Sequence, residues 1–196
     1  MTEVDHLAVR PRSENLDRFV NILVKELRDE LVLDELRNEP PIRAYRDFYW
    51  RVGLDPTKVR PASEAILRRL AQGKSFPQIN TVVDAYNLAS AKTRVAIAAF
   101  DADRVRGGFR MRLARAEEAF LGIGMDRPSV LRGVEVVVQD DEQLVAIYPY
   151  RDADASKLTS GTSAAHFMIC GVPGIPREKL TEAEATTREF VERFGR

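Results

Sequence analysis

The spacing of hydrophobic residues changes near Lys92, and this change limits the folds that the chain can adopt. Before Lys92, apolar residues recur every three to four positions, which is the period of an amphipathic helix. After Lys92, apolar and polar residues alternate in short segments, which is the period of a half-buried strand. Helices that precede strands, instead of alternating with them, predict an α+β fold with N-terminal helices packed on a mainly antiparallel sheet.

Four helices are expected before the change of spacing, and a fifth closes the chain. Prolines at 40 and 41 separate the first two helices, because proline has no amide hydrogen to donate. Gly73 is a suitable residue to end the third helix. The expected helices are 13–36, 42–53, 62–74, 79–93 and 177–194.

The expected strands are short and lie between Arg94 and Val172. Gly107-Gly108 suits a tight turn between the first two of them. The acidic stretch QDDEQ suits the turn of a later hairpin. The segments are 94–101, 109–116, the hairpin 134–150, and 165–172.

Cysteine and histidine, which commonly bind transition metals, are scarce. The only cysteine, Cys170, lies in an apolar run, and the two histidines, His6 and His166, are far apart in the sequence. One cysteine cannot form an intramolecular disulfide or a cysteine cluster, and the histidines lack the spacing of a zinc motif. The sequence therefore predicts no metal and no cofactor, and it gives little support to a Ser-His-Asp hydrolase.

The sequence has no apolar run near the roughly 18 residues needed to span a bilayer. The first residues, MTEVDHLAVRPRSENLDRF, also lack the apolar segment of a signal peptide. We therefore expect a cytoplasmic protein that does not contact a membrane.

Charge is unevenly distributed, although the chain carries no net charge. Residues 37–112 contain 15 lysines and arginines but only 7 aspartates and glutamates. This excess fits either ordinary solvated helix faces or a local basic surface for phosphates. The candidates for phosphate or RNA contacts stand where the third helix ends, and they are Arg68, Arg69 and Lys74.

The stretch RAYRDFYWR at 43–51 interleaves arginines with aromatic residues. Such a mixture is suited to RNA, since aromatic rings stack on unpaired bases. Tyr45, Phe48 and Tyr49, however, have the helical spacing of core residues. Trp50 is the ring expected to lie outside that core face.

Three polar residues recur on the helix expected at 79–93. Asn80, Asp84 and Asn87 are four and three positions apart, so a helix places them on one face. The stripe borders the apolar face, which fits caps and hydrogen bonds to loops. The alternative is the wall of a cleft for a polar ligand.

Four motifs in order resemble the B3/B4 domain of the phenylalanyl-tRNA synthetase beta subunit. The first is I-N-x-V-V-D-x-x-N at 79–87, followed by Ala99-Phe100-Asp101 at the end of an apolar strand. The second is the strand FRMRLARAEEAF, with Glu118 at the position of the family's glutamate. The third and fourth are Gly133 to Asp140, and the stretch YPYRDADASKLTSGT with Ser156, Thr159 and Thr162 in register.

The resemblance covers about residues 43–172, and no motif of a synthetase aminoacylation core is present. It implies a B3/B4-type sheet, with an N-terminal helical extension at 1–38 and a B3/B4-like domain at 39–196. In the synthetase this domain hydrolyses the ester of mischarged tRNA. The resemblance therefore implies tRNA or aminoacyl-tRNA as the partner, and a free-standing editing deacylase as one function.

The chain departs from the family's pattern at two places. Ala98 replaces a histidine implicated in editing, and Asp152-Ala153 replaces a glycine pair. The candidates for positioning water or substrate are Asp152, Asp154, Thr159 and Thr162. The candidates for the ligand pocket are Asn80, Asp84, Asn87, Ala98, Asp101 and Glu118.

Three functions stay open on the sequence alone. One is a deacylase that acts on mischarged aminoacyl-tRNA. The second is a non-catalytic module that binds RNA or an amino-acid-like ligand, which the absence of histidine at Ala98 favours. The third is a protein-interaction domain without a role in RNA binding.

Overall fold

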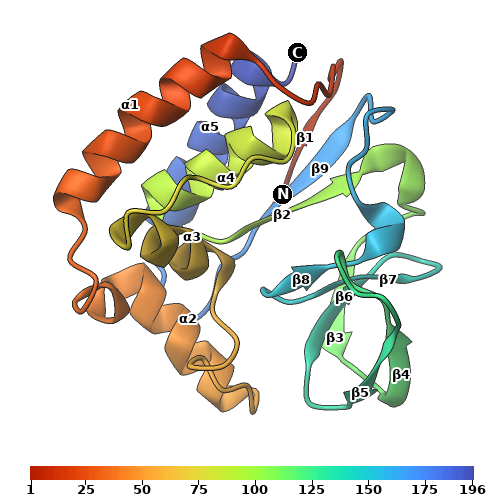
Figure 1. The fold of residues 1–196 in the computed structure, drawn as a ribbon. Coiled ribbons are helices and arrows are strands. Elements are labelled where there is room, and N and C mark those ends of the chain that lie inside the picture. Colours follow the sequence, from red (N-terminus) through yellow and green to blue (C-terminus); the bar gives the residue numbers. More distant parts are fainter.

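The computed structural model describes residues 1–196 and confirms the expected α+β class (Figure 1). Helices gather on one side of the molecule and most strands on the other. The α-helices are α1 (Glu14–Glu30), α2 (Pro40–Arg51), α3 (Ala62–Ala71), α4 (Thr81–Thr93) and α5 (Arg177–Phe194), and the short 3-10 helices are η1 (Leu36–Asn38), η2 (Ala102–Arg104) and η3 (Asp154–Ser156). None of the helices combines the length and the apolar character that are needed to cross a lipid bilayer.

Nine short strands form three antiparallel sheets. The first sheet has the order β1-β9-β2, the second has the order β3-β6-β7-β8, and β4 pairs with β5. The strands are β1 (Thr2–Val4), β2 (Ile97–Asp101), β3 (Arg110–Leu113), β4 (Ala116–Phe120), β5 (Ser129–Arg132), β6 (Val136–Gln139), β7 (Leu144–Ile147), β8 (Arg151–Asp152) and β9 (Ala165–Ile169).

The expected turn between the first two strands does not form a hairpin. β2 pairs with β9, whereas β3 pairs with β6 in a different sheet. Gly107 has a φ of +68°, and a Cβ atom there would overlap the carboxylate of Asp141. The left-handed backbone of Gly107 is the feature that favours glycine at this position. The strand expected at 109–116 also divides, because β4 pairs separately with β5.

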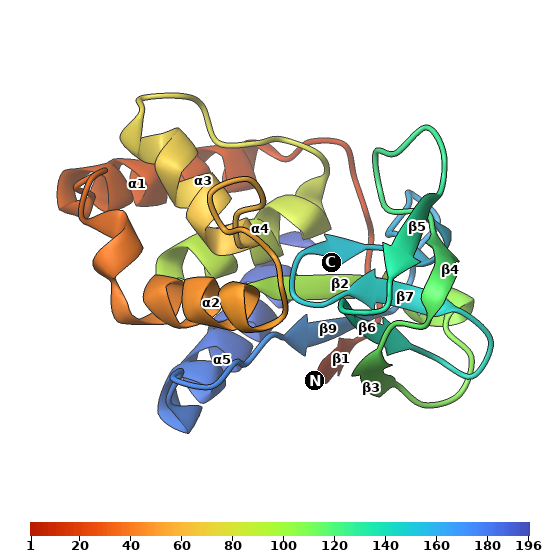
Figure 2. The same cartoon turned by 90° about the horizontal axis from the view of Figure 1, so that it is seen from below.

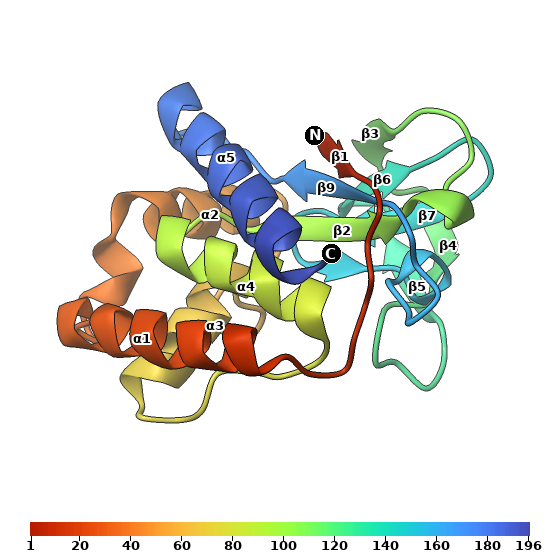
Figure 3. The same cartoon turned by 90° about the horizontal axis from the view of Figure 1, so that it is seen from above.

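The first sheet separates two parts of the hydrophobic core. Ile97 and Ala99 of β2 face the core shared by α1, α3, α4 and α5. Ala98 and Phe100 face the opposite way, onto α2 and the second sheet. This alternation is what a strand with both faces buried requires. In Figure 3, α1, α4 and α5 lie side by side, with α4 between the other two.

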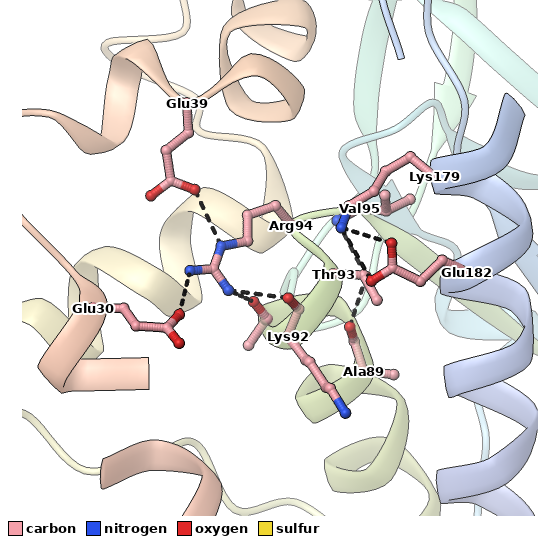
Figure 4. Close-up of polar contacts among 10 residues, drawn as sticks. Glu30, Glu39, Ala89, Lys92, Thr93, Arg94, Val95, Lys179 and Glu182 are labelled. Atoms are coloured by element: carbon pink, nitrogen blue, oxygen red, sulfur yellow. Dashed lines mark hydrogen bonds and ion pairs between the residues drawn. The ribbon is translucent and has the colours of Figure 1, made fainter. Parts of the chain in front are cut away.

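Arg94 closes the C-terminal end of α4 and links it to two other segments (Figure 4). Its guanidinium donates to Glu39 at 3.1 Å and to Glu30 at 3.4 Å. It also donates to the carbonyl oxygen of Lys92 at 3.0 Å, where a cation is favoured by the helix dipole. These contacts connect the end of α1 and the start of α2 to the domain.

We predict that Arg94→Ala lowers the free energy of unfolding by about 2 kcal/mol, while Arg94→Gly lowers it by about 1 kcal/mol. Arg94 has a left-handed backbone with a φ of +63°, which glycine adopts without the strain of a side chain. Both variants lose the same contacts, so the difference isolates the backbone term. Urea unfolding monitored by circular dichroism measures both values. An alanine variant as stable as the glycine variant would contradict this explanation.

The division at residue 38 stays a prediction. Leu16, Val20 and Leu23 of α1 belong to the same hydrophobic cluster as Phe190 and Val191 of α5. The expected extension thus packs directly on the B3/B4-like part. The first helix is shorter than expected, since α1 ends at Glu30.

Candidate functional site

A small cavity brings together three of the residues selected from the sequence. Asn87 of α4, Ala98 of β2 and Asp152 of β8 line a space of about 120 Å³. The rest of its wall is mainly apolar and includes Tyr86, Ile97, Ala146, Tyr148, Pro149, Met168 and Cys170. The cavity therefore offers an apolar chamber with a few polar groups, which is the usual character of a ligand site.

Asp152 lies where the edges of two sheets meet. Its Oδ2 accepts a hydrogen bond of 3.3 Å from the backbone amide of Ala99, on edge strand β2. Burial among apolar side chains raises the pKa of Asp152 to about 7, because it disfavours the charged form. One role of Asp152 is therefore to satisfy the edge of β2. A carboxyl that changes charge near neutral pH inside a cavity is also suited to proton transfer.

A basic cleft of about 530 Å³ adjoins this cavity. Ala62, Tyr150 and Arg151 line both spaces. The lining of the cleft contains six basic residues and no acidic residue, and the six are Lys58, Arg60, Arg68, Arg69, Lys74 and Arg151. A concave surface with one sign of charge attracts and concentrates anions.

Arg151 is a residue that the sequence did not single out as a ligand contact. Its Nη1 donates to the carbonyl oxygen of Ile123 at 3.0 Å, and its guanidinium lies 5.3 Å from the centre of the Tyr150 ring. Its Nε is buried and has no hydrogen-bond partner. An unpaired buried donor is costly unless a ligand or water satisfies it. The basic excess at 37–112 could have indicated Lys58 and Arg60, but it does not extend to Arg151.

The buried carboxylate of Glu64 holds the arginine at the edge of the cleft. Its Oε1 accepts from Arg68 Nε at 2.7 Å and from Arg46 Nη1 at 3.1 Å. Arg68 is thus fixed in place, but part of its charge is compensated. Lys58, Arg60, Arg69 and Lys74 are exposed and form no ion pair, so they contribute most of the positive potential that a ligand would meet.

Asn80 and Asp84 lie at the start of α4 and do not line the cavity. Asn80 caps the helix, with its Oδ1 accepting from the amides of Val82 and Val83 at 3.1 and 2.9 Å. Asp84 Oδ1 accepts from the amide of Ile79 at 2.8 Å. Burial raises the pKa of Asp84 to about 6. The three polar residues therefore have different roles. Asn80 has extended backbone and caps the helix, and Asp84 accepts from the chain just before it. Only Asn87 lines the cavity.

Asp101, Thr159 and Thr162 form a separate hydrogen-bonded group outside the cavity lining. Thr162 Oγ1 donates to Asp101 Oδ2 at 2.6 Å and accepts from the amide of Thr159 at 2.9 Å. Asp101 also accepts from the amide of Asp103 at 3.1 Å. Within this structure the three residues fix the loop before β9.

Asp154 and Glu118 also lie away from the cavity. Asp154 pairs with Lys157 at 2.7 Å on η3. Glu118 lines a different hollow beside β4, where Arg112 donates to both of its carboxylate oxygens. Those hydrogen bonds lower the pKa of Glu118 to about 2, so its charge is already compensated. Of the predicted catalytic residues, the structure places only Asp152 in the cavity.

Comparisons with known proteins agree with this architecture. The family model of the B3/4 domain matches residues 44–193. One similar solved structure is an N-terminal fragment of the phenylalanyl-tRNA synthetase beta subunit from Pyrococcus horikoshii, with a TM-score of 0.50 and 15% identity. The match covers 58% of this chain and 40% of that fragment, so the chain spans less than half of its length. No curated protein matches the chain. The match over residues 44–193 shows that the chain belongs to the B3/4 domain family.

Proposed function

We propose that this protein binds the 3′ end of an aminoacyl-tRNA and hydrolyses its ester bond. The observation that carries the proposal is the wall shared by the basic cleft and the small cavity at Ala62, Tyr150 and Arg151. The 3′ end of an aminoacyl-tRNA combines phosphates with an amino acid, so it needs two such adjoining spaces. The related synthetase domain supports tRNA as the partner.

The roles of the residues follow from their positions. The basic residues of the cleft contact the terminal phosphates. The aminoacyl group enters the cavity, where Asp152 in its ionised form accepts a proton from a water molecule. The water oxygen bonds to the ester carbonyl carbon, and the developing negative charge is stabilised by the donor Nε of Arg151. The bond to the ribose oxygen then breaks, and that oxygen takes the proton from Asp152.

The cavity restricts the amino acid that it can accept. Its volume of about 120 Å³ is slightly less than the roughly 150 Å³ of a dry cavity that holds benzene. Most of the lining is apolar, and Asp152 and Arg151 are its only charged residues. We therefore infer a substrate with a small or apolar side chain.

The second candidate function is binding without hydrolysis. Ala98 supports it, because it stands in the cavity wall at the position of the family's editing histidine. Asp152 is then the only group in the cavity that could accept a proton from water. Under this hypothesis Asp152 only accepts the hydrogen bond from the backbone amide of Ala99 on β2 and takes no part in catalysis.

A deacylation assay on a panel of correctly charged and mischarged tRNAs distinguishes the two functions. The deacylase hypothesis predicts release of at least one amino acid faster than spontaneous hydrolysis in buffer. Binding of tRNA with no accelerated release from any member of the panel would reject hydrolysis and support the binding module. Absence of tRNA binding at low salt would reject both.

A further inference from the structure

A further hollow, of about 430 Å³, lies beside α2 and is separate from the basic cleft. It is lined by Arg37, Asn38, Arg43, Arg46, Asp47 and Trp50. Trp50 is 57% exposed, whereas Tyr45 and Tyr49 on the same helix are buried. Trp50 is therefore the one aromatic ring of the stretch at 43–51 that lies outside the core, and it is exposed at this hollow.

The surroundings of Trp50 differ from those of an apolar docking surface. Trp50 is the only hydrophobic residue in the lining, and three of its five neighbours there are arginines. Interfaces between proteins usually have an apolar centre from which charge is depleted. A single ring among cations instead matches a site for single-stranded nucleic acid, in which a base stacks on the ring and phosphates contact the cations.

The arginines retain donors for such a ligand. Arg43 pairs with Asp47 through Nε at 3.0 Å, which leaves its two terminal nitrogens free. Arg46 uses Nη1 for Glu64 and for the carbonyl oxygen of Pro56. Arg37 forms no ion pair and is exposed. The positive charge of the three arginines is thus only partly compensated by Asp47 and Glu64, so donors remain for phosphate groups.

The hollow adjoins the basic cleft through one buried carboxylate. Glu64 binds Arg46, which faces the hollow, and Arg68, which faces the cleft. Two guanidinium groups on a single carboxylate must be close neighbours. A strand of RNA that leaves the cleft can therefore reach Trp50 across the surface formed by α2 and α3, which are neighbours in Figure 2.

We propose that the hollow around Trp50 is a second RNA-contact site, at which an unpaired base stacks on the indole ring. Phosphates on either side of that base contact Arg37 and Arg43. The site takes single-stranded RNA, because a base inside a duplex has no free face to offer. It extends the bound RNA beyond the 3′ end and does not depend on hydrolysis in the cavity.

Trp50 is the only tryptophan of the chain, so its fluorescence reports on this hollow alone. Titration with an eight-nucleotide adenylate RNA at low salt is expected to quench the fluorescence in a saturable manner. Inorganic polyphosphate, which has charge but no bases, is expected to cause little quenching of the Trp50 fluorescence. The same quenching is expected for Asp152→Asn, since the two sites are separate.

Binding of the same RNA with a fluorescent label is measured in parallel by anisotropy. Trp50→Ala is expected to weaken binding by about 10-fold, the usual range for one stacked base, and Trp50→Phe by less. Ile22→Ala is the matched control, because Ile22 is 59% exposed on α1 and does not line the hollow. Saturable RNA binding without quenching, or with equal affinity for Trp50→Ala, would overturn the proposal. Failure of the adenylate RNA to bind at all would also overturn it, whatever the result of the deacylation assay.

Discussion

Asp152→Asn is expected to lower ester hydrolysis by about 100-fold or more and to raise stability at pH 8. The rate falls because asparagine cannot accept a proton from water, and general bases contribute about 10²–10⁴-fold. The amide oxygen of asparagine can still accept from the amide of Ala99, so the edge of β2 keeps its partner. The measurements are initial deacylation rates, corrected for spontaneous hydrolysis, and unfolding by urea.

The sign of the stability change follows from the raised pKa. An aspartate in an unfolded chain has a pKa of about 4, whereas burial gives Asp152 a pKa of about 7 in the folded protein. The folded state therefore binds the proton more tightly. This contribution to stability is complete below about pH 4 and is lost as the pH rises to about 7. Above pH 7 the wild type holds a buried charge that Asp152→Asn lacks.

The rate of hydrolysis should change with pH in the opposite direction to this stability contribution. Only the ionised carboxylate can accept a proton, so wild-type hydrolysis is expected to rise with pH and to level off above about 7. A variant that is more stable and less active at pH 8 would assign Asp152 to function. If Asp152→Asn hydrolyses the ester as fast as the wild type, Asp152 is not the base.

Asp84→Asn is the matched control for this experiment. Burial also raises the pKa of Asp84, to about 6, and its carboxylate also accepts from one backbone amide. Asp84 does not line the cavity. We therefore expect a gain of stability above pH 6 that is smaller than that of Asp152→Asn, because the pKa is raised less, and an unchanged rate of hydrolysis. A similar loss of activity in both variants would indicate a general structural effect.

The sequence predicts those parts of the fold that depend on local periodicity. The last helix has the expected bounds, Arg177–Phe194, and the β6–β7 hairpin forms around its acidic turn. The strands β1 and β8 are not expected from the sequence, because strands of three and two residues are too short to show a period of two. β1 also pairs with β9, which is far away in the chain, whereas β8 pairs with its sequence neighbour β7.

The site is less predictable than the fold, because one residue type can serve several purposes. Asn87 and Asp84 look equivalent on a helical wheel, yet only Asn87 reaches the cavity, while Asp84 binds the chain just before α4. Arg151 faces both spaces because β8 lies between them. Neither fact is contained in local spacing. The place of Arg68, Arg69 and Lys74 in a basic surface is more predictable. Basic residues that are close in sequence stay close in space, so an excess of charge in one segment gives a local charged surface.

Replacing Lys58, Arg60 and Lys74 together with alanine is expected to weaken tRNA binding by about 100-fold at about 0.1 M salt. Each phosphate contact releases about 0.7 of a counterion from a single strand, which corresponds to roughly a fivefold effect per contact at this salt concentration. The three side chains line the cleft and form no ion pair in the protein. Their removal should therefore leave the free energy of unfolding nearly unchanged.

The salt dependence gives this prediction a second measurable quantity. A plot of the logarithm of the binding constant against that of salt concentration should become less steep by about 2 for the triple variant. The matched control replaces Lys25, Arg127 and Arg177, which are exposed residues outside the cleft, and it changes the net charge by the same amount. Equal losses in the two triple variants would mean that overall charge, and not the cleft, attracts the RNA. A loss confined to the cleft variant, with hydrolysis reduced at low tRNA concentration but restored at saturation, would place the phosphates beside the cavity that contains Asp152.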